Sequence, residues 1–421
     1  MQAFLMTHYS DPQRLQTLID GLDQFNATPG KGTTRLTYSP EFRQAADYLR
    51  DRMEEAGLTV REDAVGNIIG RLEGSNPELA PVMVGSHFDS VPNGGKFDGQ
   101  AGVIAGIEIA FQLKSRGLAP VRPVEFIAMI EEEGTRFGGG LLASRIMTGK
   151  VDMQQLVTFT DDDGISVAEA MQAYGLDPAS AHQAIRQPHS IHAFLELHIE
   201  QGPVLESHGE DVAVVDAIVG LGQLKVAFRG QAGHAGTTPM NARRDALTGA
   251  VTALAQLPDL ALAIGQDAVL TVGKLDVYPG GANVIPDLVV FTADIRAPKE
   301  EVVRTLMDQT RAVIERAGGN GLSVEVEEQL FVAPVPLSCE LHKCLSHHAD
   351  ALGLKSRIMV SGAGHDAMIM ADFAPTGLVF VPSRNGISHA PEEWTDYDQL
   401  AKGVDVLFLT ICDLAEVKLT D

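Results

Sequence analysis

The stretch PVMVGSHFDSVPNGGKFDGQAGVIAGIEIAFQL, residues 81–113, decides the fold of this chain. Its first residues are apolar with a β-branched bias, as in a buried parallel strand, and its last residues repeat apolar side chains at helical spacing. The polar middle, residues 85–99, is therefore predicted to connect a strand to a helix. Because open α/β sheets bind ligands outside the carboxyl ends of their strands, we expect chemistry at this crossover.

The crossover carries His87, Asp89 and, on a glycine-rich loop, Asp98. Imidazole and carboxylate groups are usual protein ligands of zinc and similar ions, and a second carboxylate near a histidine can hold its ring. A histidine and an aspartate two residues apart are, on their own, more often a hydrogen-bonded turn than a metal site. The metal interpretation therefore depends on partners elsewhere in the chain.

Composition limits the classes of protein. With 421 residues the chain is too long for one ordinary core, so two domains are expected. The formal net charge of -24 argues against a nucleic-acid partner, which needs clustered Lys and Arg. No apolar run is expected to reach the roughly 18 residues of a membrane span, and the N-terminal residues lack a signal-peptide pattern. We therefore predict a cytoplasmic protein without a membrane partner.

The cysteines and one histidine pair receive structural interpretations. Cys339, Cys344 and Cys412 show no CxxC spacing and lie in helical patterns, so we predict reduced, packed side chains without a metal or catalytic role. His347 and His348 lie on a helical segment without an acidic partner pattern, and we predict that both lie at the surface.

Two further apolar runs end in chemically capable residues. VEFIAMI, residues 124–130, precedes three glutamates at 131–133, and FLELHI, residues 194–199, carries His198 near its end. A solvated acidic loop and a core histidine are the ordinary interpretations. We prefer a functional one, because neighbouring parallel strands end at the same sheet edge and would bring these groups to His87.

From about Val212 the pattern changes to long alternating strands with two helices, in the order β, β, α, β, β, α, β. This order predicts an antiparallel sheet covered on one face, with helices over 241–257 and 298–317. After Pro334 the α/β pattern returns, and His389 follows its last strand. The predicted fold is an α/β catalytic domain, residues 1–211 and 334–421, with a mixed sheet and helices on both faces. An α+β domain, residues 212–333, is inserted into it.

The polar residues expected at the strand ends form one constellation: His87, Asp98, Glu132, Glu133, His198 and His389. Three imidazoles and two carboxylates suffice for two metal ions that share a bridging carboxylate, which leaves one glutamate as a general base. A divalent metal lowers the pKa of bound water toward neutrality, and a nearby carboxylate can pass the proton to a leaving amine. The constellation therefore indicates hydrolysis of an amide-like bond.

Seven strings resemble one known family: GSHFDSVPNGGKFDG, EEEG, LHIEQGPVLE, GHAGTTPM, GGANVIP, SGAGHDA and NGISHAPEEWT. They are similar to the hydantoinase/carbamoylase branch of the dinuclear zinc amidohydrolases, which are related to the M20 aminopeptidases. The strings span nearly the whole chain in the family's order. The resemblance implies a catalytic α/β domain, an inserted lid that also forms a homodimer, and two divalent ions per subunit. Zinc is expected, with manganese, cobalt or nickel as alternatives.

The resemblance also implies roles for the metal-site residues. Two sets of three residues would hold the two ions and share one carboxylate: His87, Asp98 and His198, and Asp98, Glu133 and His389. Asp89 would orient His87, and Glu132 would be the general base. This agrees with the chemistry above, because a base must lie beside the metals without being a ligand.

Further roles are implied for residues that touch the substrate. His234 would hydrogen-bond the oxyanion, Asn283 would bind the substrate, and Gln201 would reach its carbamoyl side. Arg296 would hold a carboxylate, for which its planar fork is suited, and lid closure would bring Arg296 and His234 to the metals. A turn histidine and a surface arginine are the structural alternatives. His365 and Asp366 are expected beside the site, without a definite role.

The choice of substrate is less firmly determined. SHFDSVPNGG and FGGGLLASR differ from the allantoate-enzyme pattern, and GISVAEAMQAYGLDP and DVYPGGANVIPD favour N-carbamoyl-L-amino-acid hydrolases, whereas SGAGHDA favours the allantoate enzymes. We predict release of an amino acid, ammonia and carbon dioxide from an N-carbamoyl-L-amino acid. Allantoate and N-carbamoyl-β-alanine are the alternative ureido substrates. An aminopeptidase of the wider family and a non-catalytic binding protein are the more distant alternatives.

Overall fold

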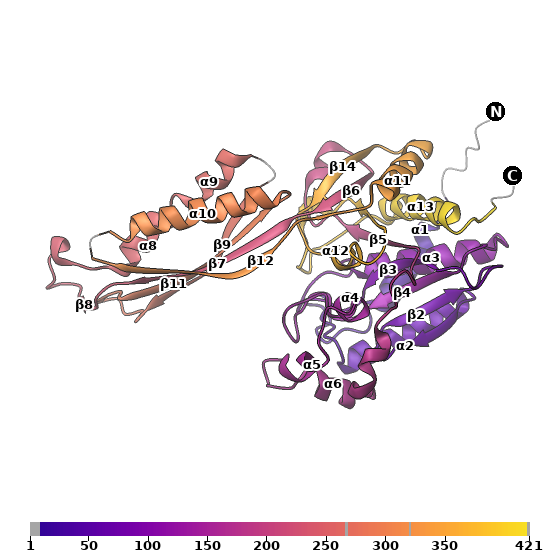
Figure 1. Cartoon of the computed structure of the whole chain (residues 1–421), viewed down its shortest axis with the longest axis horizontal. Coiled ribbons are helices and arrows are strands. Elements are labelled where there is room, and N and C mark those ends of the chain that lie inside the picture. The colour runs from indigo at the N-terminus through magenta and orange to yellow at the C-terminus, as the bar shows by residue number, and fades with distance from the viewer. Residues whose placement is uncertain (1–8, 266–267, 320, 419–421) are drawn as a thin grey trace. The chain divides into compact units, whose positions relative to one another are not determined.

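The computed structural model describes residues 9–265, 268–319 and 321–418. They form two compact units, coloured along the chain in Figure 1. The first unit takes its residues from Met1–Asp216, Leu337–Met359 and Gly364–Asp421, and the second from Ala217–Pro336 and Val360–Ala363. The sequence placed the limits of the insertion at residues 212 and 333.

A mixed nine-stranded sheet organises the first unit. Its strands are β1 (Thr59–Glu62), β2 (Ile68–Leu72), β3 (Val82–His87), β4 (Val124–Met129), β5 (Ala193–Ile199), β6 (Val212–Ile218), β13 (Val335–Pro336), β14 (Ser356–Ser361) and β15 (Thr376–Val381). Their order is β1-β2-β4-β3-β5-β15-β6-β13, and β14 pairs with β6. The central strands β4, β3, β5 and β15 run parallel, whereas β2 and β6 pair antiparallel beside them.

Burial explains why these central strands are continuous apolar runs. Every residue of β3, β4, β5 and β15 is buried, which is the environment that parallel strands have in α/β proteins. The register pairs His87 of β3 with Met129 of β4, and His198 of β5 with Phe380 of β15. All four carboxyl ends therefore reach the same edge of the sheet, as the sequence predicted.

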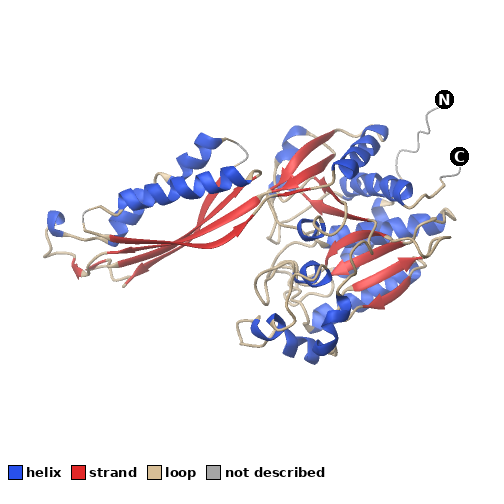
Figure 2. Cartoon of the chain, in the orientation of Figure 1, coloured by secondary structure: helices blue, strands red, loops and turns tan. Residues whose placement is uncertain are grey.

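Helices pack along this sheet, as Figure 2 shows. They are α1 (Pro12–Leu22), α2 (Pro40–Glu55), α3 (Gln100–Ser115), α4 (Leu142–Met147), α5 (Gln155–Thr158), α6 (Val167–Tyr174), α7 (Val204–His208), α11 (Cys339–Ala351), α12 (Asp366–Met370) and α13 (Tyr397–Leu414). The long helices α3 and α13 contact each other and the central strands, and α12 contacts β5 and β15. Helix α3 is buried almost all round, so the crossover that begins it is held firmly.

The second unit is a four-stranded antiparallel sheet in the order β12-β7-β11-β9, with a small β10-β8 pair. Its strands are β7 (Gly220–Arg229), β8 (Gly233–His234), β9 (Val269–Tyr278), β10 (Val284–Ile285), β11 (Leu288–Ala297) and β12 (Ser323–Val332), and its helices are α8 (Ala246–Leu254), α9 (Leu257–Ile264) and α10 (Glu300–Ala317). Alternate residues of β11 are buried, and Val289 and Phe291 join a cluster with α8 and α10. The helices thus cover one face of this sheet, as predicted.

The structure corrects two expected elements of this region. The strand predicted at 212–220 as part of the insertion is β6, which pairs with β15 and so extends the first unit's sheet. The helix predicted over 241–257 begins only at Ala246, where the side chain of Asp245 caps it, and ends at Leu254. A second helix, α9, then begins with Pro258 in its first turn, because proline fits a helix start and not its interior.

One apolar stretch is longer than the sequence analysis expected. Residues 246–264, which comprise α8 and α9, have a mean hydropathy of 1.5 and could cross a membrane by length and composition alone. This is weak support for a membrane span, because Ala250, Ala253 and Leu257 pack into the core of the second unit. The rest of the stretch leaves apolar side chains at the surface.

His348 is buried, although the sequence predicted that both His347 and His348 lie at the surface. His347 is exposed as expected. His348 lies on the face of α11 that packs against α13, where Asp413 is 2.9 Å from its Nε2. The three cysteines are free: Cys339 and Cys344 lie on α11, and Cys412 lies on α13.

Candidate active site

Four neighbouring strand ends supply the predicted constellation. His87 is the last residue of β3, and the three glutamates at 131–133 follow β4 by one residue. His198 is the last residue but one of β5, and the loop after β15 carries His389. Because these strands are neighbours in the order β4-β3-β5-β15, the sheet brings their polar ends together.

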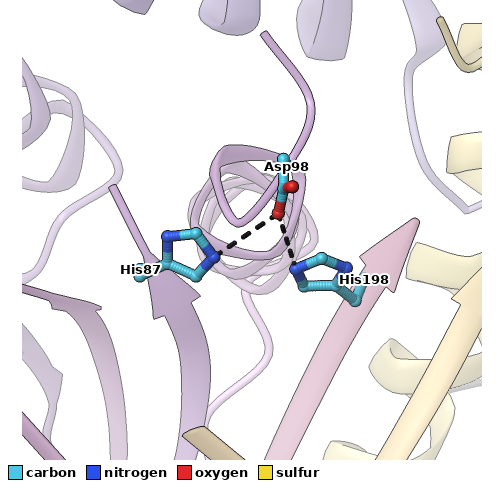
Figure 3. A group of neighbouring side chains, drawn as sticks. All are labelled: His87, Asp98 and His198. Atoms are coloured by element: carbon cyan, nitrogen blue, oxygen red, sulfur yellow. Dashed lines mark ion pairs between the residues drawn. The ribbon is translucent and has the colours of Figure 1, made fainter. Parts of the chain in front are cut away.

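Asp98 lies between three imidazoles. Its Oδ1 is 3.6 Å from His87 Nε2 and 3.1 Å from His198 Nε2, as Figure 3 shows. Its Oδ2 is 3.0 Å from His389 Nε2. A carboxylate in this position can be shared by two cations, each completed by different neighbours.

Glycine is required directly after this aspartate. Gly99 has φ +67°, and a Cβ there would collide with the ring of His87. Only a residue without a side chain lets the backbone turn against the imidazole and start α3. This explains the glycine of the FDG segment in physical terms.

The two glutamates reach the same place from β4. Glu133 Oε1 is 3.6 Å from His389 Nε2, and Glu132 Oε2 is 3.8 Å from His87 Nε2. Three sets of donor atoms lie within 4.8 Å of one another: His87, Asp98 and His198; Asp98, Glu133 and His389; and His87, Glu132 and Glu133. The first two sets are those implied by the family resemblance.

This donor set fits a divalent metal ion. Glu133 Oε1 is buried and has no hydrogen-bond partner, which is costly for a carboxylate oxygen unless a cation completes its surroundings. Imidazole nitrogens and carboxylate oxygens are donors that zinc and similar ions accept. The site can therefore hold a divalent cation next to a further carboxylate, that of Glu132.

Burial and crowding shift the protonation of these groups. Burial, aided by Glu133, raises the pKa of Glu132 well above its usual value despite the opposing effect of His87. Burial, aided by Asp98, raises the pKa of Glu133 to about 7. Burial disfavours the charged Asp98, but its contacts with the three histidines hold its pKa well below normal. The carboxylates of this centre thus need positive charge to stay ionised.

Asp89 has a wider role than the sequence predicted. Its Oδ1 is 3.6 Å from His87 Nδ1, and its backbone carbonyl oxygen, at 3.3 Å, is the hydrogen-bond partner of that nitrogen. The same carboxylate also accepts the backbone N–H groups of Glu132, at 3.1 Å, and Glu133, at 3.2 Å. One side chain therefore positions both the histidine and the acidic loop.

Three residues at these strand ends have left-handed backbones. Glu131, Gln201 and His389 have φ values of 51°, 59° and 55°, in a region that non-glycine residues rarely adopt. Such conformations cost free energy and cluster at functional sites, where they aim neighbouring side chains. Sequence pattern alone gave no indication of them.

Gln201 lies in the centre, as the resemblance implied. Its Nε2 donates to Asp98 Oδ2 at 2.9 Å, and its backbone N–H donates to Ser383 Oγ. Its Oε1 is buried without a hydrogen-bond partner. The amide thus has an acceptor available for a ligand that enters beside Asp98.

Glu393 is a positioning residue that the sequence analysis missed. Its Oε1 accepts from the backbone N–H groups of Phe97 and Asp98, each at 3.0 Å, and its Oε2 accepts from Ser388 Oγ at 2.7 Å. Glu393 therefore links the loop of Asp98 to the loop of His389. The APEEW segment that holds it was quoted with the motifs, but neither of its acids could be tied to Asp98 without the fold.

His365 lies beside the centre, with its ring centroid 4.4 Å from that of His198. Asp366 is fully buried at the start of α12, and burial raises its pKa to about 7. Glu196 accepts from Ser86 Oγ and from the backbone N–H of Ala367. These residues form the buried support behind His198.

The remaining predicted residues lie in the second unit. His234 of β8 pairs with Val284 of β10, and Ala235 N–H donates to the carbonyl of Asn283, so His234 and Asn283 are neighbours. Arg296 lies near the end of β11, where it contacts Asp294 and the carbonyl of Gly362 at 2.9 Å each.

The two parts of this predicted substrate site are far apart. The pair of His234 and Asn283 lies toward the Leu288 end of β11, and Arg296 is eight residues further along that strand. At ~3.4 Å per residue, this places Leu288 and Arg296 about 27 Å apart. The second unit therefore brings together His234 and Asn283 but not Arg296.

Comparison with known proteins matches residues 83–413 to Peptidase family M20/M25/M40. The N-carbamoyl-L-amino-acid amidohydrolase of Paenarthrobacter aurescens is 46% identical over 396 residues, 94% of this chain and 96% of that protein. The allantoate amidohydrolase of Escherichia coli (strain K12) is 39% identical over 415 residues, 98% and 99% of the two chains. A solved amidase of the hydantoinase/carbamoylase family from Burkholderia multivorans has a TM-score of 0.89 at 34% identity, covering 96% of this chain and 98% of its own.

Proposed function

The chain belongs to Peptidase family M20/M25/M40, in its hydantoinase/carbamoylase branch, and we propose that it hydrolyses an N-carbamoyl-L-amino acid. The products are the amino acid, ammonia and carbon dioxide. The observation that carries this proposal is the pair of donor sets that share Asp98, with Glu132 beside them. The carbamoyl-amino-acid enzyme is also the more similar of the two relatives, at 46% against 39% for the allantoate enzyme.

Two divalent ions complete the proposed site. His87, Asp98 and His198 would hold one ion, and Asp98, Glu133 and His389 would hold the other. Zinc is the expected metal, with manganese, cobalt or nickel as alternatives, because availability often decides among N/O sites. When bound, such ions polarise a carbonyl group and lower the pKa of water.

Glu132 is the proposed general base. It takes a proton from the water that attacks the ureido carbonyl carbon and gives it to the amino-acid nitrogen as the C–N bond breaks. The carbamate that remains decomposes to ammonia and carbon dioxide.

Second-unit residues recognise the substrate in this proposal. Arg296 binds the substrate carboxylate with two parallel hydrogen bonds, and Gln201 of the first unit binds the carbamoyl amide. His234 donates to the oxyanion of the tetrahedral intermediate, and its neighbour Asn283 holds the substrate beside it.

The distance within β11 supports a homodimer. One small ureido substrate cannot touch Arg296 and His234 of the same second unit, because they lie at opposite ends of its sheet. We infer that the partner subunit supplies His234 and Asn283, and that the inserted unit is both lid and dimerisation domain. This replaces the expectation that closure of a single lid brings both residues to the metals.

Exposed apolar side chains support the same assignment. Leu262 of α9 is 77% exposed, and Val269, Leu275 and Tyr278 of the edge strand β9 are also exposed. Strand β9 also carries Lys274 and Asp276, which limit pairing along the strand, but its exposed apolar side chains favour contact with another chain. This surface also accounts for the apolar outer side of residues 246–264 without a membrane partner, and we retain a cytoplasmic location.

The test is ammonia release by metal-stripped protein before and after addition of zinc, manganese or cobalt. The substrates are an N-carbamoyl-L-amino acid, N-carbamoyl-β-alanine and allantoate, with dipeptide cleavage followed separately. We expect metal-dependent release from the first substrate. Ammonia release from only one of the other ureido compounds would show that this compound, and not an N-carbamoyl-L-amino acid, is the substrate. Cleavage of dipeptides alone would contradict the proposal. If the protein binds metals but acts on none of these substrates, the alternative of a non-catalytic binding protein would be favoured.

A further inference from the structure

We propose a separate site for one divalent transition-metal ion on Cys344, His348 and Asp413, between α11 and α13. One ligand atom from each residue lies within 4.8 Å of the others. His348 Nε2 and Asp413 Oδ2 are already 2.9 Å apart. This assignment departs from the expectation that the cysteines have no metal role and that His348 lies at the surface.

The cluster lies away from the candidate active site. The carbonyl of Ala415, two residues after Asp413, accepts from Val121 and Arg122, which immediately precede β4. The side chain of Leu345, next to Cys344, is close to Gly377 at the start of β15. The cluster is therefore near the amino ends of the strands, whereas the candidate active site is at their carboxyl ends.

Helix geometry brings the three donors together. Cys344 and His348 are four residues apart on α11, so they share one face of that helix. Cys344 contacts Thr410 and His348 contacts Asp413, so α11 and α13 run in the same direction at this point. His348 and Asp413 both lie in the last turn of their helices.

A cation is favoured where two helices end side by side. The carboxyl end of a helix carries a partial negative charge of roughly half a unit, and here two such ends meet. The carboxylate of Asp413 adds a full negative charge at a position where the helix end disfavours it. A bound metal ion would offset the negative charge of the two helix ends and of the Asp413 carboxylate.

The donor types suit zinc or cobalt. A thiolate, a neutral imidazole and a carboxylate form a mixed S/N/O set, and a tetrahedral ion with bonds of about 2.0–2.3 Å needs only small shifts of these atoms. The side chain of Asp413 is 63% exposed, so solvent on its side can supply a fourth ligand.

The expected effect of such an ion is structural. It would join α11 to α13, and α13 packs against β15 and β5, which carry His198 and lead to His389. Without an ion, the same residues still form the hydrogen bond between His348 and Asp413. The experiment must therefore separate metal binding from this simpler polar contact.

Cobalt titration can detect metal binding at the Cys344 cluster specifically, because the candidate active site offers only nitrogen and oxygen donors and no thiolate. Cobalt is added to the metal-stripped full chain, and the ultraviolet thiolate-to-cobalt charge-transfer band is followed. We expect a band that saturates at one thiolate-bound ion per chain and is removed by zinc. Cys344→Ser should abolish the band, whereas Cys339→Ser, which changes an exposed cysteine of the same helix, should retain it.

Asp413→Asn and His348→Gln test the other two donors. Asp413 is exposed, so its replacement should leave the fold intact and weaken cobalt binding at the band by about tenfold or more. Absence of the band in the wild type would overturn the proposal. A band that persists in Cys344→Ser, or that both other variants leave unchanged, would also overturn it, since cobalt would then bind a thiol without this cluster.

Discussion

The central sheet of the first unit and the sheet of the second unit present opposite kinds of surface. Every residue of strands β3, β4, β5 and β15 is buried. Strands β9 and β12, which form the edges of the second sheet, contain only partly buried and exposed residues. Strands covered on both faces leave only their ends for chemistry, so the polar groups concentrate there. The second sheet instead has edge strands whose apolar side chains, such as those of Leu275 and Tyr278, are exposed.

This difference indicates a division of labour. In the proposed function, the buried strand ends of the first unit hold the metals, transfer the proton and contact the carbamoyl group through Gln201. The second unit would supply the other substrate contacts and the dimer interface. Variants in the first unit should therefore affect metal content and the chemical step. Variants of Arg296 in the second unit should affect substrate affinity. Variants of His234 should lower the rate of the chemical step in the site of the neighbouring subunit.

The largest expected effect is that of Glu132→Gln. Removal of the general base should lower kcat by about 10³-fold, within the usual range for positioned acid–base groups. Metal content should remain that of the wild type, because Glu132 is not a proposed ligand. Elemental analysis and ammonia release check both statements.

Glu133→Gln is the matched control for this variant. It changes the neighbouring residue, which we assign to a metal, and should lower metal content together with activity. Full activity of Glu132→Gln with both metals bound would show that another group is the base.

Glu393→Gln should have the next largest effect. Glutamine has only one acceptor oxygen, so it cannot accept from the N–H groups of Phe97 and Asp98 and from Ser388 at the same time. The loop of Asp98 should therefore lose its fixed position. We expect metal affinity to fall by about 10- to 100-fold, as for other residues that support ligands. Competition with a chelator measures this, and Glu392→Gln, on the exposed neighbour, should behave as wild type.

Arg296→Lys tests the second unit. Lysine keeps the charge but loses the planar fork, so KM for an N-carbamoyl amino acid should rise by about tenfold with a smaller change in kcat. The wild type should discriminate strongly against the corresponding carboxamide, and the variant should discriminate less. Equal changes in KM for the N-carbamoyl amino acid and for its carboxamide would show that Arg296 does not recognise the carboxylate.

The smallest effect concerns stability in acid. Burial tends to raise the pKa of Asp211, but Lys402 and Lys355 outweigh it and lower that pKa. The pKa of Asp211 is therefore lower in the folded chain than in the unfolded chain, where it is near 3.9. Asp211 stabilises the fold fully above pH ~3.9, and this stabilisation is lost as the pH falls through the folded pKa. Lys402→Met should cost below about 1 kcal/mol at neutral pH and flatten this acid dependence.

Arg229→Met is the matched variant in the second unit. Arg229 pairs with Glu325, and both side chains are more than half exposed, so loss of the pair should not alter the melting temperature measurably. Denaturant unfolding at several pH values compares the two variants. A larger loss in Arg229→Met than in Lys402→Met would contradict the proposed contrast between the units.

The sequence predicted the parts of the fold that depend on local pattern. Apolar runs that end in polar residues identified β3, β4, β5 and β15, and the common edge of neighbouring parallel strands then placed His87 near His198. It could not assign β6 to the correct sheet, because alternation shows that a strand has two faces but not which strand lies beside it.

Contacts across long sequence distances were also beyond prediction. Glu393 meets Asp98 across 295 residues, and Asp413 meets His348 across 65, so neither pair leaves a spacing pattern. The break between α8 and α9 is different. The predicted helix already stopped at Leu257, directly before Pro258, but α8 ends earlier, at Leu254, and Pro258 lies in the first turn of α9.

Activity of a mixed dimer tests the division between the units most directly. Glu132→Gln and His234→Ala chains, each carrying a different affinity tag, are produced together and the heterodimer is isolated through both tags. If His234 acts in the partner's site, one site of the heterodimer has both residues intact, and it should show about half the wild-type activity. If each chain uses its own His234, both sites lack a residue, and a heterodimer no more active than its parents would contradict the account.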